Sequence, residues 1–111
     1  MSDLIFVAIP TKGCVRNGAI TEETLKFVAD LHRVNPDKVF LCPMIQDYAL
    51  LKYLPEMDAT WEVWGAHCSR LIRSCDEVWV AKFDGYDTST GVQAEIRLAS
   101  ELQKPVLYLS P

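Results

Sequence analysis

Four short apolar runs, separated by longer stretches of mixed polarity, constrain the fold of this chain more than any other feature. The runs lie at residues 4–9, 39–42, 78–81 and 106–109. Apolar runs of this length are typical of strands covered on both faces, as in parallel sheets. The stretches between them repeat apolar residues at three- and four-residue spacing, which indicates amphipathic helices. This alternation predicts right-handed βαβ crossovers and a mostly parallel sheet.

The length of 111 residues suits one domain, so residues 1–111 are predicted to form a single α/β unit. We expect a three-layer sandwich with a doubly wound, flavodoxin- or Rossmann-like sheet and strand order 2-1-3-4. Ligands of such sheets bind at the carboxyl ends of the strands, where the chain order reverses. Residues 10–20, the segment from Pro43, and residues 83–89 follow those ends.

The connections carry weaker signals than the strands. Residues 11–19 are predicted to be a loop, and residues 44–60 a lid or an irregular helical segment. Thr21 is predicted to cap a helix that ends near residue 35, and Ser89 or Thr90 a helix that runs to about residue 103. A further helix is predicted from Trp61. The apolar stripe of the first of these helices is predicted to be Leu25, Val28, Ala29 and Leu31.

Net charge and the lengths of the apolar runs limit the kinds of partner that we expect for this protein. The net charge of −4 argues against a nucleic-acid polymer, which requires a clustered basic surface. The first apolar run is too short for a signal core or a membrane span, so we expect a cytoplasmic protein without a membrane partner. A small anionic ligand remains compatible with the charge, because a few basic or backbone N–H groups can bind it.

The four cysteines form no C-x-x-C pair and are interpreted as reduced thiols. A zinc site built from Cys14, Cys42, Cys68 and His67 stays open as a minor alternative, because loops after parallel strands can bring distant residues together. We expect neither a metal nor a cofactor.

The stretch from residue 85 to residue 95 is the most informative for function. Ser89, Thr90 and Gly91 place hydroxyl and backbone N–H groups at a helix start, which suits a phosphate or another oxyanion. An ordinary helix cap is the alternative. Glu95 falls on the inward face of that helix, whereas Gln93, Arg97, Ser100 and Lys104 are placed on the outer face. A buried carboxylate needs a polar cleft or substrate, or else a structural ion pair or capping role.

Residues 61–109 resemble the nucleoside 2′-deoxyribosyltransferase-like family, which includes the 2′-deoxynucleoside 5′-phosphate N-hydrolases and related uncharacterised bacterial and prophage proteins. The resemblance rests on a helix ending Ser74-Cys75-Asp76, the strand at 77–81, Gly85-Tyr86, Ser89-x-Gly91-x-x-x-Glu95, and Lys104-Pro105-Val106 before the last strand. These features cover somewhat under half of the chain.

The resemblance implies that Glu95 is the nucleophile that attacks the anomeric carbon of a 2-deoxyribose. The protein is then an N-glycosidic bond hydrolase or deoxyribosyltransferase for a nucleotide or nucleoside. Ser89 matches the serine that contacts phosphate in the phosphate-hydrolysing members. The other expected substrate-binding residues are Pro10, Lys12, Asp84, Tyr86, Thr90, Gly91 and Cys68.

Two departures from the family concern the acid of the reaction. The family commonly has an Asp where Cys68 stands here, and a first-strand Tyr near the position of Ile5. A thiol is a poor acid at neutral pH. Either another group takes over this role, with His67, Asp58, Asp84 and Tyr86 as candidates, or the reaction has been lost or changed.

Two other classes of function therefore stay open. One is a non-catalytic nucleotide-binding or sequestering module of the same fold, and the other is an oligomeric structural or interaction protein. Trp61 and Trp64 could stack on a base, but their spacing favours core or subunit packing. We expect a homo-oligomer, a dimer or larger.

Overall fold

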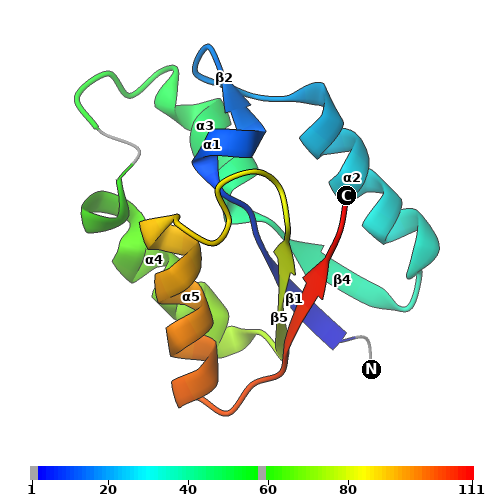
Figure 1. The fold of residues 1–111 in the computed structure, drawn as a ribbon. Helices are drawn as coiled ribbons and strands as arrows, with labels where there is room; N and C mark the ends of the chain where they lie inside the picture. The colour runs from blue at the N-terminus through cyan, green and yellow to red at the C-terminus, as the bar shows by residue number, and fades with distance from the viewer. Residues whose placement is uncertain (1–2, 58–59) are drawn as a thin grey trace.

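Four parallel strands form the central sheet of the protein. The computed structural model describes residues 3–57 and 60–111. The strand order is β4-β1-β5-β6, and each neighbouring pair is parallel (Figure 1). The predicted order 2-1-3-4 is confirmed. The bounds are β1 Asp3–Ala8, β4 Lys38–Leu41, β5 Glu77–Ala81 and β6 Val106–Leu109.

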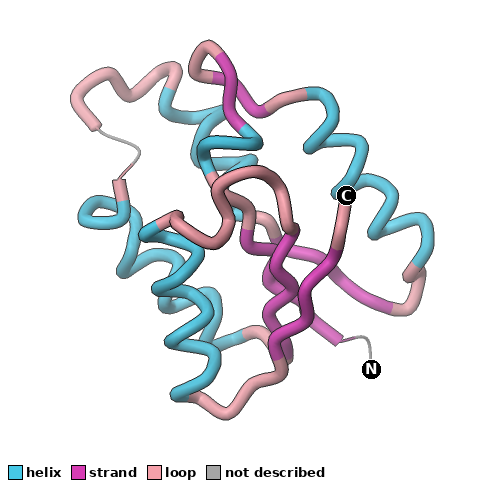
Figure 2. Tube along the Cα trace, viewed as in Figure 1, coloured by secondary structure: helices cyan, strands magenta, loops and turns pink. Residues whose placement is uncertain are grey.

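Helices cover both faces of this sheet, which gives the three predicted layers. α4 (Trp61–Ser74) and α5 (Thr90–Glu101) lie on one face and α2 (Glu22–Val34) on the other (Figures 1 and 2). Alternate strand residues supply the two cores, because successive side chains of a strand point to opposite faces. Phe6 and Val78 pack with α4 and α5, whereas Ile5 and Trp79 belong to the cluster on the α2 side.

The start of α2 follows the prediction, but its buried stripe does so only in part. The Thr21 hydroxyl caps the helix by accepting the backbone N–H of Thr24 at 3.2 Å. Val28 is buried as predicted, whereas Leu25 is 44% exposed. Thr24 takes the inward position because its hydroxyl pairs with that of Thr21 at 2.7 Å. Leu31 is buried, and Ala29 is exposed, so the prediction for Ala29 was wrong.

The segment predicted to be a loop after β1 is structured. It contains α1 (Thr11–Cys14) and a hairpin of β2 (Val15–Arg16) and β3 (Ala19–Ile20). Asn17 and Gly18 form the two-residue turn, with φ of 54° and 76°. Asn-Gly is the pair that best tolerates positive φ at both central positions of such a turn. This short-range signal could have predicted the hairpin.

The segment after β4 is also more regular than predicted. Pro43 follows the strand and occupies the first turn of α3 (Pro43–Leu51), where the missing N–H of proline costs nothing. α3 ends before Pro55, the residue that indicated an irregular segment. Asp58, which was one of the candidate acids, lies outside the described residues.

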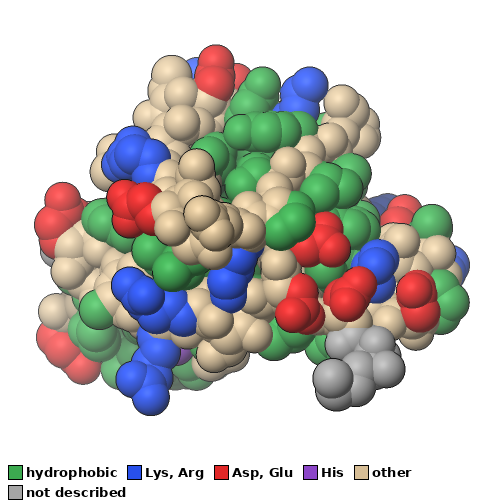
Figure 3. Space-filling view, turned by 90° about the horizontal axis from the view of Figure 1, so that it is seen from below, with side chains coloured by type: hydrophobic (Ala, Val, Ile, Leu, Met, Phe, Trp, Pro, Cys, Tyr) green, Lys and Arg blue, Asp and Glu red, His purple; other side chains and the backbone are tan. Residues whose placement is uncertain are grey.

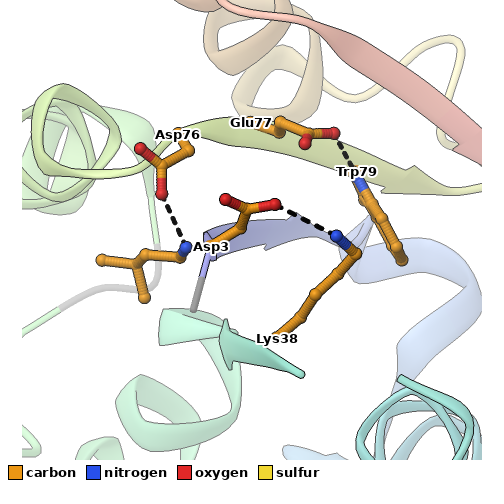
Figure 4. Close-up of polar contacts among 6 residues, drawn as sticks. Asp3, Lys38, Asp76, Glu77 and Trp79 are labelled. Carbon is orange, nitrogen blue, oxygen red and sulfur yellow. Dashed lines mark hydrogen bonds and ion pairs between the residues drawn. The ribbon is translucent and has the colours of Figure 1, made fainter. Parts of the chain in front are cut away.

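Polar contacts fix the amino-terminal end of the sheet. The backbone N–H of Leu4 donates to Asp76 Oδ2 at 2.7 Å, and Lys38 Nζ donates to Asp3 Oδ2 at 3.1 Å (Figure 4). Acidic, basic and apolar side chains all reach the surface on this side of the molecule (Figure 3). Within residues 3–57 and 60–111, no helix is long and apolar enough to cross a membrane.

Lys104 has a role that the helical pattern did not predict. It lies beyond the last residue of α5, and its Nζ donates to the backbone oxygens of Ile72 at 2.9 Å and Arg73 at 2.7 Å. It also reaches the oxygen of Cys75. The ammonium group therefore satisfies carbonyls at the end of α4 instead of pointing into solvent.

Candidate functional site

A cavity of about 480 Å³ opens at the carboxyl end of β1, between the segments that follow β4 and β5. The chain order of the sheet reverses between β1 and β5, beside this cavity. Its walls come from β1, α1, α3, α4, the loop after β5, and α5. The volume is within the range of small-molecule sites, about 300–1,000 Å³. The position agrees with the general rule for ligand sites of open parallel sheets.

Glu95 supplies a buried carboxyl group to the wall of this cavity. It lies on α5, facing the sheet as predicted, and only 8% of its surface is exposed. Burial raises the pKa of Glu95 to about 8. A hydrogen bond from the Cys68 thiol opposes this shift, and the negative charge of Asp47 adds to it. The protonated form therefore predominates at neutral pH, with a minor ionised fraction.

Cys68 lines the same cavity from α4, so its predicted position is confirmed. Burial is the main cause that raises the pKa of its thiol to about 12, and the nearby carboxylates Glu95 and Asp47 contribute to the same shift. A thiol with so high a pKa donates a hydrogen bond but rarely loses its proton. Cys68 therefore serves Glu95 as a neutral hydrogen-bond donor.

Asp47 is a second buried carboxyl group of the cavity, and the sequence analysis missed it. It lies on α3, and 6% of its surface is exposed. Burial raises the pKa of Asp47, against the opposing influence of His67. A signal was available: a helix that begins at Pro43, directly after a strand end, carries Asp47 one turn later on the same face.

The first turn of α5 brings small polar groups to the cavity. The Ser89 hydroxyl accepts the backbone N–H of Val92 at 3.2 Å and so caps the helix, which was the alternative interpretation of this serine. Ser89, Thr90 and Gly91 nevertheless all line the cavity. A helix start of this kind offers partial positive charge to a bound anion.

Two indoles complete the walls. Trp61 and Trp64, at the start of α4, are both half-buried and both line the cavity. Trp61 also packs against the core between α4, α5 and the sheet, the interpretation that its spacing favoured. The Trp61 ring lies against Gly65 on the same helix, where an added Cβ would come within 2.8 Å of it. Trp64 meets the His67 ring edge to face at 6.0 Å between centroids.

Lys12 brings a positive charge to the rim. Its Nζ lies 3.6 Å from Asp84 Oδ2, and both side chains are more than two-thirds exposed. Two glycines allow α1 to approach the loop after β5. A Cβ on Gly13 would lie 2.7 Å from the backbone of Asp84, and one on Gly85, whose φ is +91°, would lie 2.8 Å from Lys12 Cβ. The close contact therefore requires residues without side chains.

Three of the expected substrate-binding residues lie off the cavity wall. Pro10 is buried at the end of β1, and Asp84 reaches the site only through its ion pair with Lys12. Tyr86 packs against the core and meets the Tyr108 ring at 6.5 Å, so its hydroxyl is not placed as an acid of the cavity.

The thiols do not make a metal site. All four cysteines are free. Across the described parts of the chain, no three His, Cys, Asp or Glu side chains are grouped so as to hold a metal ion. The alternative zinc set of Cys14, Cys42, Cys68 and His67 is therefore not assembled.

Comparison with known proteins gives one match. A family model described as "Domain of unknown function (DUF1937)" matches residues 5–110. The match includes every element that lines the cavity and the whole central sheet except Asp3 and Leu4. No curated protein and no solved structure matches the chain significantly.

Proposed function

The chain belongs to the DUF1937 family of domains of unknown function, and we propose that it cleaves the N-glycosidic bond of a nucleoside or nucleotide. The description of the family names no activity, so the support for this proposal comes from the residues that line the cavity. The observation that carries the proposal is the buried carboxyl group of Glu95 in a cavity that is also lined by the indoles of Trp61 and Trp64. The carboxyl group suits attack on the sugar, and the indoles suit stacking on the base.

The indoles favour a flat heterocycle as part of the ligand. Trp61 and Trp64 belong to one turn of α4, so a base that enters between α4 and α5 meets at least one aromatic face. Stacking on such a face is worth about 1–3 kcal/mol per base and suits every base. A base bound there places its sugar toward α5, which carries Glu95 and the hydroxyls of Ser89 and Thr90.

Glu95 acts as the nucleophile in this proposal. Its ionised carboxylate attacks the anomeric carbon, and the resulting glycosyl ester is then resolved by water or by a second base. The helix fixes the carboxylate before positive charge develops on the sugar. Only the ionised fraction of Glu95 reacts, so turnover rises as pH approaches the pKa of about 8.

We propose that a 5′-phosphate of the substrate binds in the same cavity. The amino-terminal end of α5 and the ammonium group of Lys12 offer positive charge, although Asp84 neutralises part of it. We therefore propose 2′-deoxynucleoside 5′-phosphates as the first substrates to test, beside free nucleosides.

The test is release of free base from a panel of 2′-deoxynucleosides, their 5′-phosphates and the ribo counterparts. Glu95→Gln keeps the size of the side chain but removes the attacking charge, so turnover should fall by about a thousandfold or more while ligand affinity persists. Glu101→Gln, an exposed residue of the same helix, is the matched control and should behave as wild type. The proposal fails if wild type releases no base from any substrate, or if Glu95→Gln releases it at the wild-type rate.

A second candidate function is a nucleotide-binding module without turnover. The observation that favours it is the Cys68–Glu95 contact, in which a neutral thiol stands beside a carboxyl group that is mostly protonated at pH 7. Calorimetric binding of the same panel without release of base would identify this function. The proposal places the protein in the cytoplasm as a homo-oligomer, without a nucleic-acid polymer or membrane as partner.

A further inference from the structure

Asp47 is a second buried carboxyl group of the cavity, and the attack of Glu95 on the anomeric carbon does not use it. It reaches the cavity from α3, whereas Glu95 reaches it from α5, so the two carboxyl groups belong to different walls. They are close enough for the charge of Asp47 to act on Glu95. Both are more than nine-tenths buried, and a chain rarely buries two carboxyl groups in one cavity without a use for them.

Cleavage of an N-glycosidic bond provides such a use. The base departs with the bonding electron pair, and an unprotonated base anion is a poor leaving group. Enzymes that cleave glycosidic bonds with retention therefore pair a carboxylate nucleophile with a second carboxyl group that protonates the leaving atom. Cys68 cannot fill this role because its thiol holds its proton too tightly.

We propose that Asp47, which lines the cavity from α3, is the general acid that protonates the departing base, while Glu95 acts from α5. This inference rests on the proposed function and adds a second catalytic residue to it. His67 is exposed and Tyr86 is turned into the core, so neither competes for the role from within the cavity.

The two steps balance in atoms and charge. First, a Glu95 carboxylate oxygen forms a bond to C1′, the C1′–N bond breaks with its electrons passing to the base, and the Asp47 proton moves to that base. Second, a water oxygen attacks C1′, the Glu95 ester bond breaks, and the Asp47 carboxylate takes a proton from the water. Both side chains return to their starting states, and the products are free base and the free sugar or sugar phosphate.

The cavity favours the required state, in which one proton is shared by two carboxyl groups. Burial disfavours the state in which both carboxyl groups are ionised. The groups that face Asp47 are the acidic Glu95 from α5 and the neutral thiols of Cys42 and Cys68, which supply no positive charge. Only His67 on α4 lowers the pKa of Asp47, and burial outweighs it. Like charges at close range share a single proton. In the resting pair this proton lies on Glu95, because the charge of Asp47 adds to the burial that raises the pKa of Glu95 to about 8. Transfer of the proton to Asp47 gives the reactive form, with Glu95 as the nucleophile and Asp47 as the acid.

The test varies the leaving group. 2′-Deoxyguanosine 5′-phosphate needs a proton on its departing base, whereas its 7-methyl derivative carries a cationic base that departs without one. Asp47→Asn should slow base release from the first substrate by about a hundredfold or more and from the second by less than about tenfold. Glu95→Gln should slow both. The exposed Asp37→Asn is the control for the change from Asp to Asn and should slow neither.

The pH profile of wild type tests the inference without a variant, which matters if Asp47→Asn folds poorly. Release from 2′-deoxyguanosine 5′-phosphate should fall on the alkaline side as the acid loses its proton, and release from the 7-methyl substrate should lack that fall. Equal slowing of both substrates by Asp47→Asn, or the same alkaline fall for both, overturns the role of Asp47. Absence of release from either substrate by wild type overturns the proposed function itself.

Discussion

The thiol of Cys68 donates a hydrogen bond to the carboxyl group of Glu95, which connects α4 to α5 beside the cavity. The bond stabilises the ionised form of Glu95, but burial outweighs it, because the pKa of Glu95 is still raised to about 8. Glu95 therefore has a higher pKa in the native state than in the unfolded chain.

Stability should consequently depend on pH through Glu95. A carboxyl group whose native pKa is raised contributes stability that is complete below the unfolded value of 4.5 and is lost as pH rises to about 8. The free energy of unfolding should fall by up to about 1.4 kcal/mol per pH unit across that window. Urea unfolding at a series of pH values measures this slope.

Glu95→Gln removes the titrating group and should flatten most of the slope, so that the variant is more stable than wild type at pH 8. Asp47, whose pKa burial also raises, should leave a smaller slope of the same sign. Glu101→Gln should keep the wild-type slope. A wild-type stability that rises between pH 5 and pH 8 would contradict the raised pKa of Glu95.

Trp61 should contribute to binding through the base alone. Trp61→Ala is expected to weaken binding of a 2′-deoxynucleoside 5′-phosphate about tenfold to a hundredfold, because stacking is worth about 1–3 kcal/mol per base. Binding of 2-deoxyribose 5-phosphate, which has no base, should change little. Titration calorimetry measures both ligands, and Tyr53→Ala, an exposed aromatic residue away from the cavity wall, is the control. Equal losses for both ligands would indicate a packing role.

The sheet could be predicted from the sequence because its signal is local. Each strand is a short apolar run, the signal of a strand in a parallel sheet. The central strands β1 and β5 are buried on two faces as expected, whereas the edge strands β4 and β6 leave Val39, Leu107 and Tyr108 exposed. The β2–β3 hairpin was missed because strands of two residues carry no periodicity, so only Asn17 and Gly18 indicate it. The buried stripe of α2 differs from the predicted one because Thr24, whose hydroxyl pairs with that of Thr21, faces inward, whereas Leu25 is exposed.

Some residues of the site could be predicted from the sequence and others could not. Glu95 and Cys68 could be placed because each lies on a long helix whose phase fixes the inward face. The start of α3 at Pro43 indicated the helix face that carries Asp47, but the burial of Asp47 depends on how α3 packs over the end of the sheet, which no local pattern predicts. Tyr86 shows the converse. It lies in the right loop, but its ring turns toward Tyr108.

The cysteines should be nearly inert toward alkylation in the folded protein. Burial raises the pKa of Cys14 and Cys75 to about 11 and of Cys42 and Cys68 to about 12. At pH 8 their thiolate fractions are then about a thousandth or less, and the thiolate is the reactive form. Iodoacetamide labelling followed by mass spectrometry should be at least about a hundredfold slower in the native state than in denaturant. One rapidly labelled cysteine in the native protein would contradict this.

The expected homo-oligomer has a candidate surface between α2, α3 and the β2–β3 hairpin. Leu25 and Met57, 44% and 37% exposed, lie in an apolar groove there. Light scattering at micromolar concentration should give a dimer or larger, and Leu25→Glu should shift it toward monomer because a charge in a buried interface is costly. Val34→Glu, at the end of α2 and outside the groove, should not. A monomeric wild type would contradict the expectation.

Lys104 should stabilise the fold from outside the site. Its ammonium group donates to the oxygens of Ile72, Arg73 and Cys75, where the end of α4 leaves carbonyls without partners in the helix. Lys104→Met keeps the aliphatic stem and removes the charge and the donors. The free energy of unfolding should fall by about 1–3 kcal/mol, the range for hydrogen bonds that involve a charged group. Lys26→Met removes only an exposed ion pair with Glu22 one turn away on α2, which is worth about 0.2–0.5 kcal/mol. Urea unfolding of both variants distinguishes the two cases, and similar losses would mean that Lys104 contributes no more than an ordinary surface lysine.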